Sequence, residues 1–130
     1  NSLRPVKPVA LPENESVAPA TKAMVAARQT CCLVVDGRGA LRGILTDKDI
    51  AGRCVARYLD PANTPAKDAM TPDPKFVDVE ETAADALNIM IAGHFRHLPV
   101  VDRRRNNAVT GVIDIAKVLY DALKRIEAEM

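Results

Sequence analysis

Residues 76–102 read FVDVEETAADALNIMIAGHFRHLPVVD, and residues 10–36 read ALPENESVAPATKAMVAARQTCCLVVD. With a shift of 66 positions, eight of these 27 residues are identical, whereas average composition would give about two. The matches include Met24 with Met90, and both stretches end in Val-Val-Asp, at residues 34–36 and 100–102. The chain is therefore an internal duplication, and its fold can be derived from a single repeat.

Beyond the paired aspartates the shift becomes 68, so that Gly43 matches Gly111 and Ile44 matches Val112. Each copy contains a short extended segment, a helix, an apolar run of strand length, a turn, a second strand and another helix. The sequence thus predicts two β-α-β-β-α repeats in a mixed α/β (α+β) fold. We expect repeat 1 over residues 1–60, a linker rich in Pro, Asp and Thr over 61–74, and repeat 2 over 75–130.

The starts and ends of the predicted helices follow from local residue types. Ser16 and Thr82 stand directly before the first helix of each repeat and are expected to cap it. The last helix begins after Asp114 and carries one apolar stripe, from Ile115 to Ile126. We expect this extended C-terminal helix to pack against repeat 1 and to continue past it.

Composition limits the classes of function. The chain has 130 residues, 48% of them hydrophobic and only 3% aromatic, and its net charge is +1. This balance predicts an ordered aliphatic core and no partnership with nucleic acid. No apolar stretch approaches 18 residues, so no membrane-spanning segment is expected. The three cysteines fit neither a disulfide framework nor a zinc site, which favours an intracellular, cytoplasmic protein with reduced thiols.

Three segments carry a resemblance to a known family. They are GILTDKDI at residues 43–50, DAMTP at 68–72 and RHLPVVD at 96–102. In this order, and with the duplication, the chain resembles a tandem pair of cystathionine-β-synthase (CBS) domains, the arrangement called a Bateman module. Within that family it is most similar to eukaryotic CBS-pair proteins of fungi and plants that also carry a Phox-and-Bem interaction domain.

The resemblance implies an architecture and a partner. In CBS pairs the two sheets face each other through pseudo-twofold symmetry, and each of two clefts mixes residues of both repeats. CBS pairs usually form flat dimers, so a homodimer is expected here. The helices that carry Met24 and Val25 in repeat 1, and Met90 and Ile91 in repeat 2, are the candidate contacts.

The first cleft is expected around Thr46 and Asp49. Thr46 ends a strand at the start of a helix, where unpaired N–H groups and the helix dipole suit an anion. Asp49 lies one turn further, and its carboxylate could accept two ribose hydroxyls. In CBS domains this Ser/Thr-x-x-Asp pattern binds the ribose and phosphate of adenosine nucleotides. The same pattern is also close to a capping box that only starts a helix.

The resemblance also implies the rest of that cleft. The ligand would be AMP, ADP, ATP or S-adenosylmethionine, acting as a regulatory ligand and not as a catalytic cofactor. Residues just after the linker would enclose the adenine: Met70, Thr71, Pro72, Lys75, Phe76 and Val77. Thr30 and Cys31 carry no positive charge, so phosphates there would need help from Lys75, Arg53 or a partner chain.

The second cleft departs from the family pattern. Asp114 and Lys117 stand where repeat 1 has Thr46 and Asp49, so the ribose-binding acid is missing. Arg96 and His97 lie where the family faces phosphates, and together with Asp114 and Lys117 they form a candidate second phosphate site. Alternatively, Lys117 only pairs with a nearby carboxylate.

These features lead to a functional hypothesis. We expect a non-catalytic regulatory module that binds an adenosine-containing ligand between its repeats and signals to an attached or partner effector domain. The alternative is a ligand-independent dimerisation scaffold. No catalytic residues and no metal ligands are expected.

Overall fold

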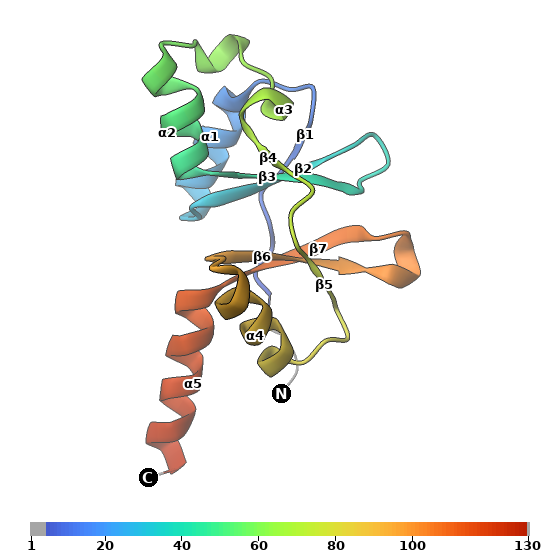
Figure 1. Ribbon diagram of the computed structural model, residues 1–130, viewed down its shortest axis with the longest axis vertical. Coiled ribbons are helices and arrows are strands. Elements are labelled where there is room, and N and C mark those ends of the chain that lie inside the picture. The colour runs from blue at the N-terminus through green and yellow to red at the C-terminus, as the bar shows by residue number, and fades with distance from the viewer. Residues whose placement is uncertain (1–4, 130) are drawn as a thin grey trace.

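The structure is a computed structural model that describes residues 5–129. It contains two sheets that face each other, with helices on the outer side of each sheet (Figure 1). The first sheet has the strand order β1 (Ala10–Pro12), β2 (Cys31–Val35), β3 (Leu41–Thr46), β4 (Thr71–Pro72). The second sheet has the order β5 (Val77–Asp78), β6 (His97–Asp102), β7 (Ala108–Asp114).

The helices follow the predicted order. Helices α1 (Val17–Ala27), α2 (Asp47–Arg53) and α3 (Ala66–Ala69) lie beside the first sheet, and α4 (Ala83–Gly93) and α5 (Ile115–Glu129) beside the second. Short 3-10 turns span Val55–Arg57, Pro61–Asn63 and Arg103–Arg105. The predicted α/β class and the duplicated β-α-β-β-α order are confirmed.

The two repeats pair their strands in the same way. In each, the first strand runs parallel to the second and the second antiparallel to the third. Equivalent residues occupy equivalent positions, because Cys31 lies opposite Thr46 and His97 lies opposite Asp114. The 66- and 68-residue shifts therefore describe the structure as well as the sequence.

Each sheet is completed at its edge by a short segment from the part of the chain that begins the other repeat. Thr71 and Pro72 form β4 and pair with β3 of repeat 1, although they lie directly before repeat 2. Val6, 66 residues earlier than Pro72, exchanges two backbone hydrogen bonds with Val112 of β7. Much of the expected linker 61–74 is thus built into the first repeat, where Ala66 and Ala69 of α3 are fully buried.

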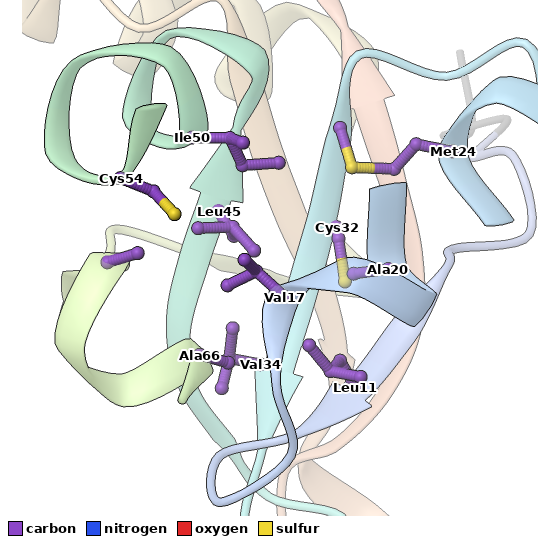
Figure 2. Close-up of a cluster of buried hydrophobic side chains, with 11 residues drawn as sticks. Leu11, Val17, Ala20, Met24, Cys32, Val34, Leu45, Ile50, Cys54 and Ala66 are labelled. Atoms are coloured by element: carbon purple, nitrogen blue, oxygen red, sulfur yellow. The ribbon is translucent and has the colours of Figure 1, made fainter. Parts of the chain in front are cut away.

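Three apolar clusters hold the fold. In the first, side chains from α1, α2, α3 and one face of the first sheet meet, among them Val17, Cys32 and Leu45 (Figure 2). A second cluster around Met90 and Leu98 is its counterpart in repeat 2. The third lies between the sheets and is built from Cys31, Leu33, Ile44 and Val112.

The apolar run at residues 31–35 has no polar alternation because both faces of β2 are covered. Cys32 and Val34 point into the first cluster, whereas Cys31 and Leu33 point toward the other sheet. The third cluster contains no aromatic side chain. Short aliphatic groups therefore mediate the sheet-to-sheet contact, as the low aromatic content suggested.

Two local predictions were wrong. Helix α5 packs against α4 and β7 of its own repeat, not against repeat 1, because Ile115 and Val118 turn into the second cluster. Ser16 occupies the N-cap position of α1, but its hydroxyl accepts no hydrogen bond from the backbone N–H groups of the first turn. Thr82 does cap α4, accepting from the Asp85 N–H at 3.1 Å.

Candidate functional site

Thr46 and Asp49 form a complete capping box at the start of α2. The Asp49 N–H donates to Thr46 Oγ1 at 3.1 Å, and the Thr46 N–H donates to Asp49 Oδ2 at 2.9 Å. Both residues are half-buried. The capping alternative is therefore confirmed as a structural role. It also fixes the two side chains side by side at the N-terminus of α2.

The stretch after α3 lies along the strand that delivers Thr46. Thr71 pairs with Ile44, and the side chain of Met70 covers Gly43, where any Cβ would collide with its sulfur. Phe76 and Lys75 are exposed, whereas Val77 is buried in the second cluster. Within the predicted first set, the Val77 side chain thus belongs to the core of repeat 2 and not to a cleft surface.

Arg53 already forms hydrogen bonds within the chain. Its Nη1 donates to the carbonyl oxygen of Met70 at 2.6 Å and lies 3.4 Å from that of Ala69. This side chain therefore ties α2 to the segment before β4. Its suggested role as a phosphate ligand in the first cleft is not favoured, because that role would break these bonds.

The four residues of the predicted second site do come together. A cavity of about 390 Å³ is lined by Arg96, His97, Asp114 and Lys117. It is also lined by residues from the other repeat and the N-terminal segment: Val6, Ala27, Arg28, Gln29, Thr30 and Cys31. This cavity thus lies between the repeats, at the starts of β2 and β6.

His97 has a structural role at this junction. Its side chain is 7% exposed, and Nε2 lies 2.8 Å from Thr30 Oγ1 and 3.7 Å from Asp114 Oδ2. Burial lowers the pKa of His97 below its usual 6.5, although the Asp114 carboxylate acts in the opposite direction. The imidazole is therefore neutral near pH 7 and links the repeats by a hydrogen bond, so it brings no positive charge to a phosphate.

Asp114 and Lys117 both make local interactions with α5. Asp114 Oδ1 accepts from the Ala116 N–H at 2.8 Å, which caps the helix start. Lys117 Nζ lies 3.3 Å from Asp121 Oδ2, an exposed pair one turn apart. The pairing that the sequence left open for Lys117 is therefore present. A second cavity of about 320 Å³ runs along the same helix and shares Asp114 and Lys117 with the first.

Gln29, Arg28 and Val6 line the cavity but were not among the predicted site residues. The repeat carried a usable signal for Val6, because the 66-residue shift places it opposite Pro72. The same shift places Gln29 opposite Phe95, a polar residue against an aromatic one. That contrast marks Gln29 as a position where the two clefts differ.

Cys31 lines this cavity, and Cys32 is buried on the other face of β2. Burial raises the pKa of Cys31 to about 12, assisted by Cys32, Asp114 and Asp47, and burial alone raises that of Cys32 to about 12. Both therefore stay protonated at physiological pH. Among residues 5–129, no group of three potential metal-binding side chains is found.

The sequence profile of the CBS domain matches residues 3–55 and 66–124. The chain belongs to the CBS domain family. Its relatives include the plant "CBS domain-containing protein CBSCBSPB3" from Arabidopsis thaliana, which is 43% identical over 125 residues, or 96% of this chain. The chain spans only 22% of the length of that relative.

Solved structures show the same CBS-pair architecture. The crystal structure of the CBS domain protein NE2398 has a TM-score of 0.77 and 29% identity, covering 90% of this chain and 88% of that one. The cytosolic domain of the Mg²⁺ channel MgtE in complex with ATP has a TM-score of 0.70 and 26% identity, covering 86% and 44%. CBS pairs are in general regulatory modules without catalytic activity. None of the helices described in residues 5–129 is both long and apolar enough to cross a bilayer.

Proposed function

We propose that this CBS pair is a regulatory module that binds an adenosine-containing ligand in the cleft at Thr46 and Asp49. The observation that carries this proposal is the capping box, which presents a hydroxyl and a carboxylate together at a helix N-terminus. The ATP complex of the MgtE cytosolic domain, which shares the fold, supports a nucleotide. AMP, ADP, ATP and S-adenosylmethionine all contain the required ribose.

The ligand would replace part of the capping box. Asp49 Oδ2 now accepts from the Thr46 N–H, and two ribose hydroxyls would donate to the same carboxylate. The base would lie against Met70, Thr71 and Pro72, with Phe76 and Lys75 at the exposed rim. Because this segment also leads into repeat 2, ligand binding would stabilise one relative packing of the repeats and so signal to an effector.

Phosphates would extend from Thr46 toward the junction of the repeats. Thr30 touches His97, and the backbone N–H of Asp47 donates to the Thr30 carbonyl at 3.0 Å. Arg53 is tied to the Met70 carbonyl, whereas Lys75 is exposed at the rim of this cleft. Lys75, or a partner chain, would therefore supply the positive charge that repeat 1 lacks at Thr30 and Cys31.

Thermal unfolding with each of the four ligands tests the proposal. A ligand at 100 times its Kd should add about 2.7 kcal/mol of stability. Asp49→Ala should abolish the shift, whereas Asp85→Ala, at the corresponding third position of α4, should retain it. The adenosine proposal fails if none of the four ligands, at millimolar concentration, changes the melting temperature.

The same module is proposed to work as a homodimer within a longer intracellular protein. Met24 and Met90 are buried in their own repeats, so they are unsuited to the contact first expected of them. Val25 and Ile91, at 74% and 58% exposure, remain on the outer helices and support it. The plant relative supports a parent protein of several domains, for which a Phox-and-Bem domain is our proposal.

The alternative function is a dimerisation scaffold without a ligand. It is favoured by the fact that Thr46 and Asp49 already satisfy each other. Sedimentation of the wild type and of Val25→Asp would establish the dimer, because a buried charge should dissociate it. A stable dimer with no response to any adenosine ligand would favour the scaffold. Turnover of a nucleotide would contradict the proposal that the chain is not an enzyme.

A further inference from the structure

The two hairpins of the molecule end in turns that lie next to each other. One turn spans residues 36–39 between β2 and β3, and the other spans residues 103–107 between β6 and β7. Ala40 and Ala108, which directly follow these turns, form an isolated antiparallel bridge between the two repeats. The turns therefore make one composite surface, to which each repeat contributes one turn.

This surface lies at the opposite ends of the strands from both candidate clefts. Strand β3 leads from the first turn to Thr46, and β7 leads from the second turn to Asp114. The strand from Leu41 to Thr46 is about 17 Å long. Both hairpins project away from the side of the molecule that carries α2 and α5 (Figure 1).

The turns carry five exposed arginines, which are Arg38, Arg42, Arg103, Arg104 and Arg105. Arg42 Nε lies 3.3 Å from Glu13 Oε2, and Arg104 Nη2 lies 2.9 Å from Glu80 Oε1. The other three guanidinium groups form no hydrogen bond or ion pair within residues 5–129. We call these three the unpaired arginines: Arg38, Arg103 and Arg105.

The carboxylates of the turns are engaged by backbone N–H groups. Asp36 Oδ1 accepts from the Arg38 N–H at 2.8 Å and from the Ala40 N–H at 3.0 Å. Asp78 Oδ1 accepts from the Arg103 N–H at 2.8 Å. These hydrogen bonds hold the pKa of both carboxyl groups below the usual range. The acids therefore serve to close the turns, and the unpaired arginines still lack an acceptor.

The backbone of the second turn does not require its arginines. Repeat 1 closes its hairpin with a shorter turn, in which Gly39 has a φ of 80°. Repeat 2 supplies the left-handed conformation with Asn106 and Asn107, at φ of 56° and 60°. Asparagine tolerates this conformation, so the two asparagines account for the turn geometry. The exposed side chains of Arg103 and Arg105 thus have no use within the fold.

The local charge balance selects the class of partner. The five arginines are matched in number by nearby carboxylates, those of Glu13, Asp36, Asp78, Glu80 and Asp102. Nucleic acids and anionic bilayers attract proteins through a net positive field, which this surface lacks. A short acidic peptide needs only local donors, because one guanidinium can hold a carboxylate by two parallel hydrogen bonds.

We propose that the paired hairpin turns form a docking surface for an acidic segment of a partner protein. Arg38 of repeat 1, together with Arg103 and Arg105 of repeat 2, binds carboxylates of that segment. Because one turn comes from each repeat, the surface is complete only while the repeats are packed together. It contains no residue of either cleft and does not depend on the proposed adenosine ligand.

The probe is a capped peptide of six glutamates, and the same peptide with six glutamines is its neutral control. Fluorescence anisotropy should show binding of the acidic peptide only. Raising NaCl from about 0.05 M to about 0.3 M should weaken it by about threefold or more. In ¹H–¹⁵N NMR spectra, the acidic peptide should shift the amides of residues 36–40 and 103–108. Shifts confined to the clefts, or no binding, would overturn the proposal.

The decisive variant combines Arg38→Gln, Arg103→Gln and Arg105→Gln. It should weaken the acidic peptide by about tenfold or more, because each exposed pair contributes up to about fivefold. Arg38→Gln alone should weaken it by about twofold or more, since repeat 1 supplies that side chain. Unchanged affinity in Arg38→Gln would overturn the composite surface. The three variants Arg38→Lys, Arg103→Lys and Arg105→Lys, combined, keep the charge but should still bind more weakly, because lysine lacks the planar fork.

The matched control removes the same charge elsewhere. Lys22, Lys48 and Arg57 are exposed on α1, on α2 and after α2, and their combined change to glutamine should alter the Kd less than twofold. Equal losses in the two glutamine triple variants would mean non-specific attraction and would overturn the proposal. Tighter binding of phosphatidylserine vesicles or of duplex DNA than of the acidic peptide would overturn the assignment to a protein segment.

Discussion

The helix starts of the two repeats occupy equivalent places but present opposite chemistry. In repeat 1, Thr46 and Asp49 form a closed capping box, with the acid one turn into α2. In repeat 2, Asp114 caps α5 alone, and the third position is Lys117, which turns to Asp121. Both copies therefore keep a side chain that caps the helix. The residue at the third helical position changes from an acid to a base, so the two clefts differ in charge there.

The strongest test of the equivalence of the repeats is a pair of core truncations. Leu45 and Ile113 are equivalent under the 68-residue shift and are both buried. Leu45→Ala and Ile113→Ala should each lower the free energy of unfolding by about 2–5 kcal/mol in chemical denaturation. Each should give a single transition, because the third cluster joins the sheets. Two separate transitions would show that the repeats fold independently.

The exposed control for these variants is Leu119→Ala on α5. Leu119 is 49% exposed, so this change should lie within about 0.5 kcal/mol of the wild type.

The next largest effect concerns the caps themselves. Thr46→Ala removes the acceptor of the Asp49 N–H and should cost about 1 kcal/mol, as should Asp114→Ala in repeat 2. Thr46→Ser keeps the hydroxyl and should restore most of the loss. If Thr46→Ala had no effect on the urea midpoint, the capping box would not contribute to stability.

His97 gives a smaller, pH-dependent effect that has no counterpart in repeat 1, where Cys31 occupies the equivalent position. Because its pKa in the folded state is below 6.5, the unfolded chain binds a proton more readily between these two values. The free energy of unfolding should therefore fall as pH drops below about 6.5 and level off once the folded-state pKa is passed. Urea titrations over this range should show a smaller decline for His97→Gln than for the wild type.

The control for the pH effect is His94→Gln, since His94 is exposed at the C-terminal end of α4. An identical pH profile for His97→Gln and the wild type would contradict the assignment.

The smallest effect is expected at Lys117. Without ligand, Lys117→Ala loses only an exposed pair with Asp121 and should change stability by about 0.3–0.5 kcal/mol. A destabilisation above 1 kcal/mol in thermal melts would show that Lys117 is a structural residue, and would weaken its assignment to a ligand.

Sequence periodicity was sufficient for the architecture because burial on both faces of β2 and β6 leaves an unmistakable apolar run. It was insufficient for α5, since the apolar stripe of a helix does not say which neighbour covers it. Only Ile115 and Val118 are used in the core, and Leu119 and Ile126 stay exposed. The hydrogen bond from Arg53 to the Met70 carbonyl could not be predicted either, because every residue has a backbone carbonyl and the residue types do not show which one accepts.

The candidate clefts were predictable only in part. The duplicated pattern identified Thr46, Asp49, Asp114 and Lys117 as equivalent positions, and the structure brings the second set together with Arg96 and His97. It could not show that His97 is buried and hydrogen-bonded to Thr30. Nor could it show that Gln29 Nε2 donates to the Lys7 carbonyl while its Oε1 accepts no hydrogen bond within residues 5–129, because this depends on where the Lys7 carbonyl lies.

The crossed edge strands have a consequence for how this protein can be made and divided. Because Val6 completes the second sheet and Thr71-Pro72 completes the first, neither half owns all of its strands. During synthesis, Val6 therefore cannot form its backbone hydrogen bonds until Val112 has been added to the chain. Two fragments separated near residue 65 should each be defective alone, yet should reassemble when mixed, since each holds the edge that the other lacks.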